Sequence, residues 1–169
     1  MLQTNFYGDN NLGMYAKATD KFLLIGSLIE EKLVTKISEK LNISPFRTTI
    51  SNSDFVGIFS CLNSSGLIIP HIATDDEVKQ LENFAKKSGM NLAVLKTKFS
   101  AIGNLVLCND NGAIVSKNIK QRNKKMIEDC LGVETVYSSI ARMPIVGSSG
   151  TATNKGCLLH RDAVDDEIK

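Results

Sequence analysis

The sequence lacks tryptophan and has few aromatic residues of any kind, 6% of its 169 residues. A row of aromatic rings for stacking nucleic-acid bases is therefore not evident. No apolar run approaches the ~20 residues that a membrane-spanning helix needs. The N-terminus also lacks the order of charged, apolar and small residues that marks a secretory signal. By default the sequence predicts a cytoplasmic protein with no membrane segment.

Positive and negative charges nearly balance in the sequence, and it contains no recognisable metal-binding or redox motif. Its net charge is +2, which is too small to indicate nucleic-acid binding by bulk charge. The four cysteines, spaced by 47, 22 and 27 residues, match no zinc or dithiol pattern, and we expect them to be reduced core residues. They are Cys61, Cys108, Cys130 and Cys157. We expect no cofactor and no bound metal.

An internal repeat with a period of about 44 residues is the most informative feature of the sequence. Its marker is a glycine that recurs at intervals of 44, 46 and 44 residues, at Gly13, Gly57, Gly103 and Gly147. A second glycine follows nine residues after each of the last three, and Phe22 holds that place in the first copy. These second glycines are Gly66, Gly112 and Gly156. We interpret all seven glycines as residues of strained turns rather than as ligands.

Each copy of the repeat predicts the same order of strands and turns. A strand-like stretch, such as Leu92–Phe99, leads into the first glycine, and a second strand follows it. The polar clusters Asn63–Gly66 and Asn109–Gly112 then predict tight hairpin turns with positive φ. A brief apolar strand, such as Leu67–Ile69, completes each hairpin.

A helix of about a dozen residues follows each hairpin. In the second copy Thr74 and Glu77 form a capping box ahead of an apolar stripe, Val78, Leu81, Phe84 and Ala85. In the third copy the stripe is Ile127, Cys130 and Leu131, with Gly132 as the stop. In the first copy it is Leu33, Ile37 and Leu41, ending near Asn42. The acidic residues that open the second and fourth helices fit the helix dipole.

The predicted fold is a single α/β domain over residues 1–169, built from repeats of about 1–43, 44–88, 89–132 and 133–169, the last incomplete. One unit cannot bury both faces of its own sheet, so neighbouring units must share a core. The period alone does not distinguish a linear stack from a ring. Closure into a ring would remove exposed strand edges, which favours it.

Several local sequences carry a resemblance to a known family. They are Phe99–Asp110, Leu67–Pro70, Pro144–Ser148 and Thr153–Leu158. With the glycine spacing, these stretches make the chain similar to archaeal-type translation initiation factor six from about Asn11 to Lys169. The resemblance implies a pentein-like propeller of five ββα-type units around a central axis. The sequence ends inside the fourth helix, so we expect a truncated chain whose fifth repeat is missing.

The resemblance also implies a function. We expect a monomeric factor that binds the large ribosomal subunit, near a ribosomal protein beside the sarcin–ricin loop. An occupied joining face would keep the small subunit away, and a role in large-subunit maturation would fit as well. The ribosome-facing candidates are the residues that directly follow three of the glycines, Ile58, Asn104 and Ser148, with Asn104 at the opening of a strand. A local explanation for the asparagine at position 104 also stays open, because asparagine tolerates a left-handed backbone conformation in an irregular turn.

The basic residues between 117 and 125 form the only concentrated charge, and Lys120, Lys124 and Lys125 are candidates for contact with rRNA. A solvated helix face explains the same residues. Two other functions stay open: a generic repeat-built scaffold for RNA or protein, and a guanidino-modifying enzyme of the pentein type. Such an enzyme needs a Cys–His–acid constellation. His71 and His160, the only histidines, lie in different units, so we expect no enzyme.

Overall fold

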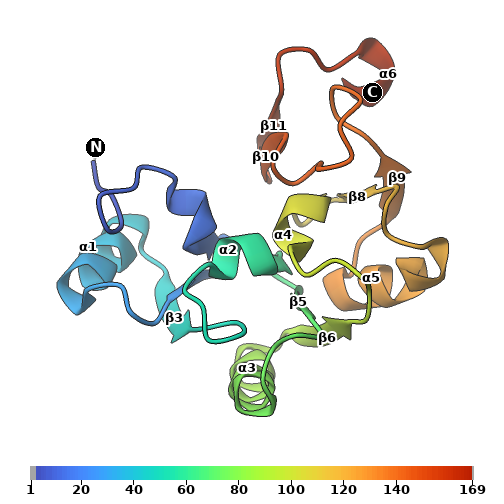
Figure 1. Cartoon of the computed structure of the whole chain (residues 1–169). Coiled ribbons are helices and arrows are strands. Elements are labelled where there is room, and N and C mark those ends of the chain that lie inside the picture. The colour runs from blue at the N-terminus through green and yellow to red at the C-terminus, as the bar shows by residue number, and fades with distance from the viewer. Residues whose placement is uncertain (1–2, 169) are drawn as a thin grey trace.

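The computed structural model describes residues 3–168 and shows the same ββαβ arrangement repeated along the chain (Figure 1). The first unit contains the 3-10 helix η1 (Leu12–Met14), β1 (Ala16–Ala18), β2 (Phe22–Gly26), α1 (Glu31–Leu41) and β3 (Ser44–Thr48). The second contains α2 (Val56–Phe59), β4 (Cys61–Leu62), β5 (Gly66–Pro70), α3 (Asp75–Ser88) and β6 (Asn91–Leu95). The fold class is therefore mixed α/β, as predicted.

The remaining two units continue the pattern. The third contains α4 (Ile102–Leu105), β7 (Val106–Cys108), β8 (Ala113–Ser116), η2 (Gln121–Asn123), α5 (Lys124–Leu131) and β9 (Thr135–Ser138). The fourth contains β10 (Gly150–Thr153), β11 (Gly156–Leu159) and α6 (Asp165–Ile168). Figure 1 shows the units following one another along an open arc, with the N-terminal unit and the C-terminal unit at its two ends. The fifth repeat that the resemblance implies stays a prediction.

Each unit forms its own small sheet, and within residues 3–168 none of these sheets closes into a barrel. In the first three sheets an antiparallel hairpin is extended by a parallel strand, in the orders β1-β2-β3, β4-β5-β6 and β7-β8-β9. A parallel partner needs a crossover connection, which α1, α3 and α5 supply. The fourth sheet holds the hairpin β10-β11 alone within the described residues.

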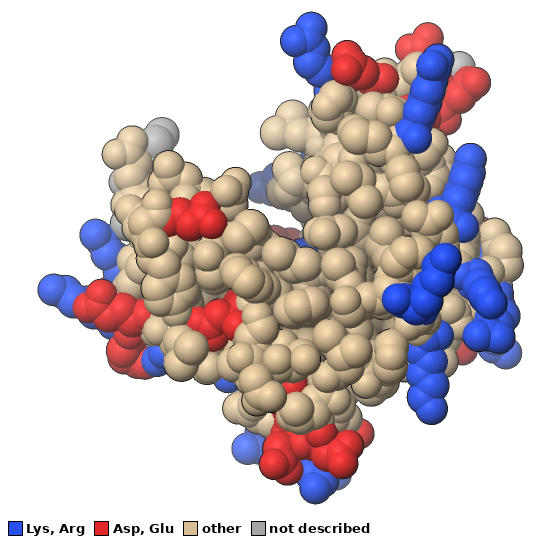
Figure 2. All heavy atoms as spheres, in the orientation of Figure 1, with Lys and Arg blue, Asp and Glu red and all other residues tan. Residues whose placement is uncertain are grey.

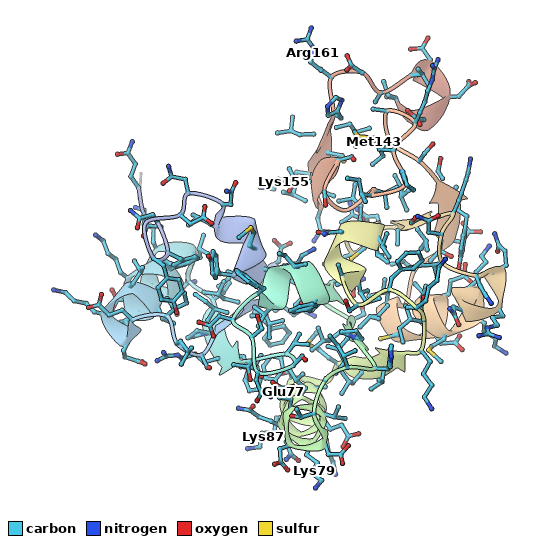
Figure 3. The ribbon with its side chains drawn as sticks, viewed as in Figure 1. Glu77, Lys79, Lys87, Met143, Lys155 and Arg161 are labelled. Carbon is cyan, nitrogen blue, oxygen red and sulfur yellow. The ribbon has the colours of Figure 1, made fainter. Side chains whose placement is uncertain are left out.

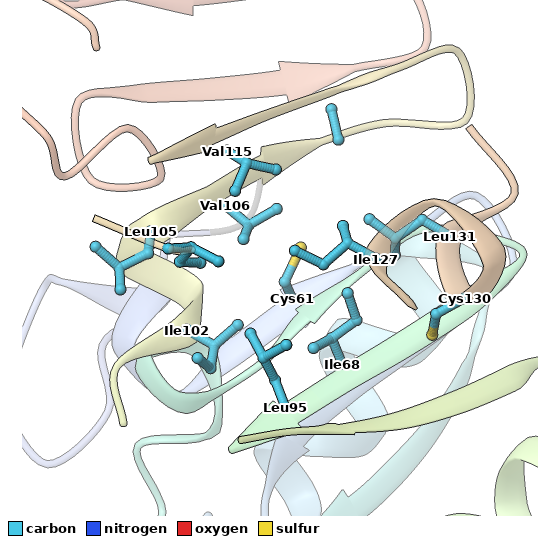
Figure 4. Close-up of a cluster of buried hydrophobic side chains, with 12 residues drawn as sticks. Cys61, Ile68, Leu95, Ile102, Leu105, Val106, Val115, Ile127, Cys130 and Leu131 are labelled. Atoms are coloured by element: carbon cyan, nitrogen blue, oxygen red, sulfur yellow. The ribbon is translucent and has the colours of Figure 1, made fainter. Parts of the chain in front are cut away.

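Helices α3 and α5 join neighbouring units because each packs between two sheets. Helix α3 buries Leu81 and Ala85 in a cluster that contains Leu24 of the first sheet and Leu67 of its own. The ring of Phe84 stacks on Phe46 of β3 at a centroid distance of 4.0 Å. Helix α5 repeats this arrangement with Ile127, Cys130 and Leu131, which pack against Ile68 of the second sheet and Val115 of the third (Figure 4). These cores therefore extend across unit boundaries.

The predicted helix signals are present in the structure. Thr74 and Glu77 form both halves of the capping box of α3. Gly132 ends α5 and Asn42 ends α1, each in the left-handed region with φ of 66° and 53°. The predicted stripe of α1 is wrong at one position: Leu41 is 50% exposed, while Val34 is buried. In α1, Val34 and Ile37 form the buried face.

Two local predictions are corrected by the structure. The segment after each first glycine was predicted as strand alone, but Gly57 and Gly103 lie in the four-residue helices α2 and α4. The hairpins exist, but their turns use side chains instead of positive φ. The Oδ1 atom of Asn63 accepts the backbone N–H groups of Ser65 and Gly66, both at 3.0 Å. Asn109 caps the next turn in the same way, since Asn and Asp readily form such turns.

Glu77 has a second role beyond its cap (Figure 3). Its carboxylate accepts the N–H groups of Ser51 at 2.7 Å and Asn52 at 2.8 Å, two residues with positive φ in the loop before α2. Burial opposes the charged form, but hydrogen bonds from Thr49, Thr74, Asn52 and Ser51 outweigh it and lower the pKa of Glu77. Glu167 of α6 binds the equivalent loop through the N–H groups of Ala141 and Arg142. These bonds hold the loops that lead to the candidate site.

Candidate functional site

The first glycines of the four units stack against one another. A Cβ atom built on Gly57 would lie 2.0 Å from the carbonyl oxygen of Gly13. The corresponding distance is 2.1 Å from Gly103 to the Gly57 oxygen, and 2.0 Å from Gly147 to the Gly103 oxygen. Real Cβ contacts are never this short, so Gly57, Gly103 and Gly147 each require glycine because the backbone of the preceding unit occupies the space. A Cβ on Gly13 would meet nothing within 4 Å.

This contact replaces the predicted reason for Gly57, Gly103 and Gly147. None of the seven repeated glycines has a positive φ; among glycines that angle occurs at Gly8, Gly89 and Gly132 within the described residues. Gly66 is also a close-approach position, since a Cβ there would lie 2.0 Å from the carbonyl oxygen of Cys130 in α5. At Gly112 and Gly156 a Cβ would meet nothing closer than 3.9 Å. The prediction of strained turns is therefore wrong.

The glycine stack places Ile58, Asn104 and Ser148 on consecutive units. Each directly follows a stacked glycine. Each also donates its backbone N–H to the carbonyl oxygen of the residue three positions earlier, which is Phe55, Ala101 or Ile145, at 3.0, 3.1 and 3.0 Å respectively. The Gly147 N–H also donates to the carbonyl oxygen of Asn104 at 2.9 Å, which ties the third unit to the fourth. The three residues thus occupy equivalent positions in one row, here called the rim together with Phe55 and Ile145.

The rim is accessible and carries mixed chemistry. Ile58 and Asn104 are half-buried and Ser148 is exposed. Phe55 and Ile145 are 37% and 42% exposed. Figure 2 shows a surface over α2 and α4 that is almost free of charged groups. Exposed apolar side chains on a surface with few charged groups are typical of the centre of a protein interface.

The side chain of Asn104 has no structural role that the described residues reveal. Asn104 lies inside α4, not at the opening of a strand, and its φ is not positive. Tolerance of left-handed geometry therefore does not explain the residue. Within residues 3–168 no hydrogen bond holds its side-chain amide. The amide is available to a partner molecule.

The candidate rRNA-binding lysines do not form one group. Lys124 pairs with Glu128 one turn along α5, with Nζ 3.5 Å from the carboxylate, and Lys125 is exposed on the same helix. Lys120 precedes η2 and lines a separate pocket of about 470 Å³ with His71, Lys96, Lys98 and Arg122. Sequence reasoning missed the contribution of Lys96 and Lys98, because the loop that carries them lies in a different part of the sequence.

The hairpin turns at the other ends of the strands are linked from unit to unit. The Nδ2 atom of Asn63 donates to the carbonyl oxygen of Asn109 at 3.1 Å, and Nδ2 of Asn109 donates to that of Thr153 at 3.0 Å. Asn154 donates to Asp110 at 2.8 Å and to Asp20 of the first unit at 2.7 Å. Because these polar groups form hydrogen bonds with one another, we interpret this end of the molecule as a structural contact between units.

The residues considered for catalysis do not assemble. The Sγ atoms of Cys61 and Cys108 lie 3.2 Å apart, between the second and third units. His71 is exposed in the lysine-lined pocket, whose lining contains no cysteine and no carboxylate. His160 lies beyond β11 next to Asp162. Among residues 3–168 no three His, Cys, Asp or Glu side chains are grouped to hold a metal ion.

Across residues 3–168, no helix combines the length and the apolar character needed to span a membrane.

Comparison with known proteins decides the family. The model of the eIF-6 family matches residues 1–169. The chain belongs to the eIF-6 family. It is 37% identical to translation initiation factor 6 of Methanocaldococcus jannaschii over 171 aligned residues, which cover 100% of this chain and 75% of the relative. It is 40% identical to that of Methanococcus vannielii, covering 100% and 74%, and 38% identical to that of Thermoplasma acidophilum, covering 99% and 74%.

These relatives are named as translation initiation factors and not as enzymes. Membership of the eIF-6 family confirms the resemblance drawn from the glycine spacing and the local sequences, and it supports a role in translation initiation. The chain spans about three quarters of the length of these relatives.

Proposed function

We propose that this protein binds the large ribosomal subunit on its subunit-joining face and prevents premature association with the small subunit. The observation that carries the proposal is the rim, an accessible and nearly uncharged row of equivalent positions on a chain of the eIF-6 family. The mechanism is steric, because a rigid domain on the joining face excludes the other subunit. We place this action in the cytoplasm, on a monomeric factor.

The proposal includes the arrangement of the units. We propose that they belong to a pentein-type propeller, which turns the equivalent positions of successive units toward one side. The stacked glycines support this, since three successive contacts between units repeat at nearly the same distance. Shared cores around α3 and α5 join the first three units into one rigid body. A rigid, preorganised surface loses little conformational entropy on docking.

The partner on the ribosome is, in this proposal, a ribosomal protein near the sarcin–ricin loop, bound through the rim. Phe55, Ile58 and Ile145 would supply apolar contact, and Asn104 and Ser148 would supply hydrogen-bonding groups. Catalysis is not needed for such a mechanism. A link with large-subunit maturation follows if the factor binds before the subunits first join.

Sedimentation with each purified ribosomal subunit tests the proposal. The protein should pellet with the large subunit alone, and it should lower the fraction of joined ribosomes in a mixture of both subunits. A generic RNA- or protein-binding scaffold would instead pellet with either subunit and would lose both complexes steeply as salt rises. Equal binding to the two subunits would refute the anti-association role.

A further inference from the structure

The pocket of about 470 Å³ that Lys120 lines brings together basic residues from three loops. His71 follows β5, Lys96 and Lys98 follow β6, and Lys120 and Arg122 lie between β8 and α5. Strands β5 and β6 are parallel, so their following loops leave the same edge of the sheet. The loop that carries Lys98 leads directly into α4 and Asn104. The chain therefore runs from this pocket directly into the element that carries Asn104.

The positive charge in this pocket is not neutralised by the protein. Within residues 3–168, Lys96, Lys98, Lys120 and Arg122 make no ion pair, and the pocket lining contains no carboxylate. Lys98 Nζ lies 4.9 Å from the centroid of the Phe99 ring, a contact that leaves its charge available. Figure 2 shows Lys and Arg side chains gathered on the side of α5, with few acidic groups among them. Such a concave basic surface concentrates anions.

The chemistry of the lining favours phosphate over other anions. A guanidinium binds phosphate oxygens in pairs, and lysines on separate loops act as point charges around it. Thr97 and Asn118 add neutral hydrogen-bonding groups to the same wall. Four cations spread over two loops, with His71 on a third, fit a chain that presents phosphates in succession better than they fit one isolated ion.

We propose that this pocket binds the sugar–phosphate backbone of RNA, without reading its sequence. The scarcity of aromatic residues agrees with contact to phosphates and not to bases. The proposal rests on the proposed function only in identifying the RNA as ribosomal. It also separates the basic residues by role: those of the pocket bind phosphate, whereas Lys124 is engaged with Glu128 on the helix face.

Binding of a fluorescent single-stranded RNA of mixed sequence to the protein tests the pocket without the ribosome. The pocket variant carries Lys96→Gln, Lys98→Gln, Lys120→Gln and Arg122→Gln. The control variant carries Lys36→Gln, Lys40→Gln, Lys86→Gln and Lys87→Gln, four exposed lysines of α1 and α3. Both changes take the net charge from +2 to +2 − 4 = −2. The two variants thus differ in where the charge is lost and not in how much.

The pocket variant should bind the RNA at least about tenfold more weakly than wild type. Its salt dependence should also fall, by up to about 3 in the slope of log K against log[salt], since each lost phosphate contact to a single strand contributes about 0.7. The control variant should retain most of the RNA affinity and most of its salt dependence. A double variant, Lys98→Gln with Arg122→Gln, should fall between them with an unchanged melting temperature, which separates lost binding from lost folding.

Two results would overturn the proposal. Equal losses in the pocket variant and the control would assign RNA binding to net charge alone. Wild-type protein that binds the RNA no better than the pocket variant does would remove the site altogether. Neither result bears on sedimentation with the large subunit, which stands or falls with the rim.

Discussion

At Gly103 the chain has no room for a single methyl group. A Cβ there would meet the carbonyl oxygens of Gly57, Ser60 and Ile58 at 2.1, 2.6 and 2.8 Å. Helix propensity alone would favour alanine by ~1 kcal/mol. We nevertheless expect Gly103→Ala to lower the free energy of unfolding by about 2–4 kcal/mol, because two backbones must separate. Chemical denaturation measures the change.

Gly112→Ala is the matched control, since a Cβ there would lie no closer than 3.9 Å to the Glu134 carbonyl oxygen. It should change stability by no more than about 0.5 kcal/mol. Similar losses in both variants would show that backbone flexibility, and not contact between units, explains the repeated glycines. The comparison also shows what spacing cannot reveal. Sequence locates glycines in register, but the atom that excludes a side chain belongs to another unit 44 or 46 residues away.

At the scale of single elements, Glu77 is the residue on which a helix start and a neighbouring loop both depend. Replacing it by glutamine keeps the shape but weakens the bonds that the carboxylate accepts from Thr49, Ser51 and Asn52. We expect Glu77→Gln to cost about 1–3 kcal/mol of stability, the range for hydrogen bonds to a charged group. Glu82→Gln, on the exposed side of α3, is the control and should be nearly neutral. A neutral result at Glu77 would mean that the loop holds its left-handed residues without help.

The same carboxylates predict how stability depends on pH. The pKa of Glu77 is lowered in the folded protein, and hydrogen bonds from Arg142 and Ser139 lower that of Glu167 to about 2, from a usual value of 4.5. A lowered pKa contributes stability that is present above the unfolded value and lost as pH falls through the folded one. Thermal denaturation between about pH 5 and pH 2 should show this loss, and Glu77→Gln should reduce it. An identical acid response in the variant would contradict the assignment.

Helices and turns differ in how far their sequences predict them. Helix α3 is readable because its capping box and apolar stripe are local signals, and both are present in the structure. The short helices α2 and α4 were missed because four apolar or small residues, such as Val56–Phe59, fit a buried strand equally well. Leu41 was predicted to belong to the buried stripe of α1 because of its spacing alone. The packing in the structure shows that the buried face ends at Ile37.

For the whole molecule, the repeat in the sequence was enough to predict an α/β chain of equivalent units and to find its family. It was also enough to name Ile58, Asn104 and Ser148, since they share one register after the stacked glycines, but it did not identify Phe55 and Ile145. The basic pocket was not predictable in full. Its lysines come from loops that are distant in sequence and meet only when β6 and β8 are placed in adjacent sheets.

The most direct test of the account is the binding of Asn104→Arg to purified large ribosomal subunits. Its control is Asn111→Arg, the same chemical change at an exposed hairpin turn outside the rim. Both variants should keep the wild-type melting temperature within a few degrees, because surface substitutions usually cost within about 0.5 kcal/mol. Asn104→Arg should bind the large subunit at least about tenfold more weakly, a loss of about 1.4 kcal/mol, since a docked rim must desolvate the added charge. Asn111→Arg should bind as wild type. Normal binding by a folded Asn104→Arg protein would contradict the proposed docking surface.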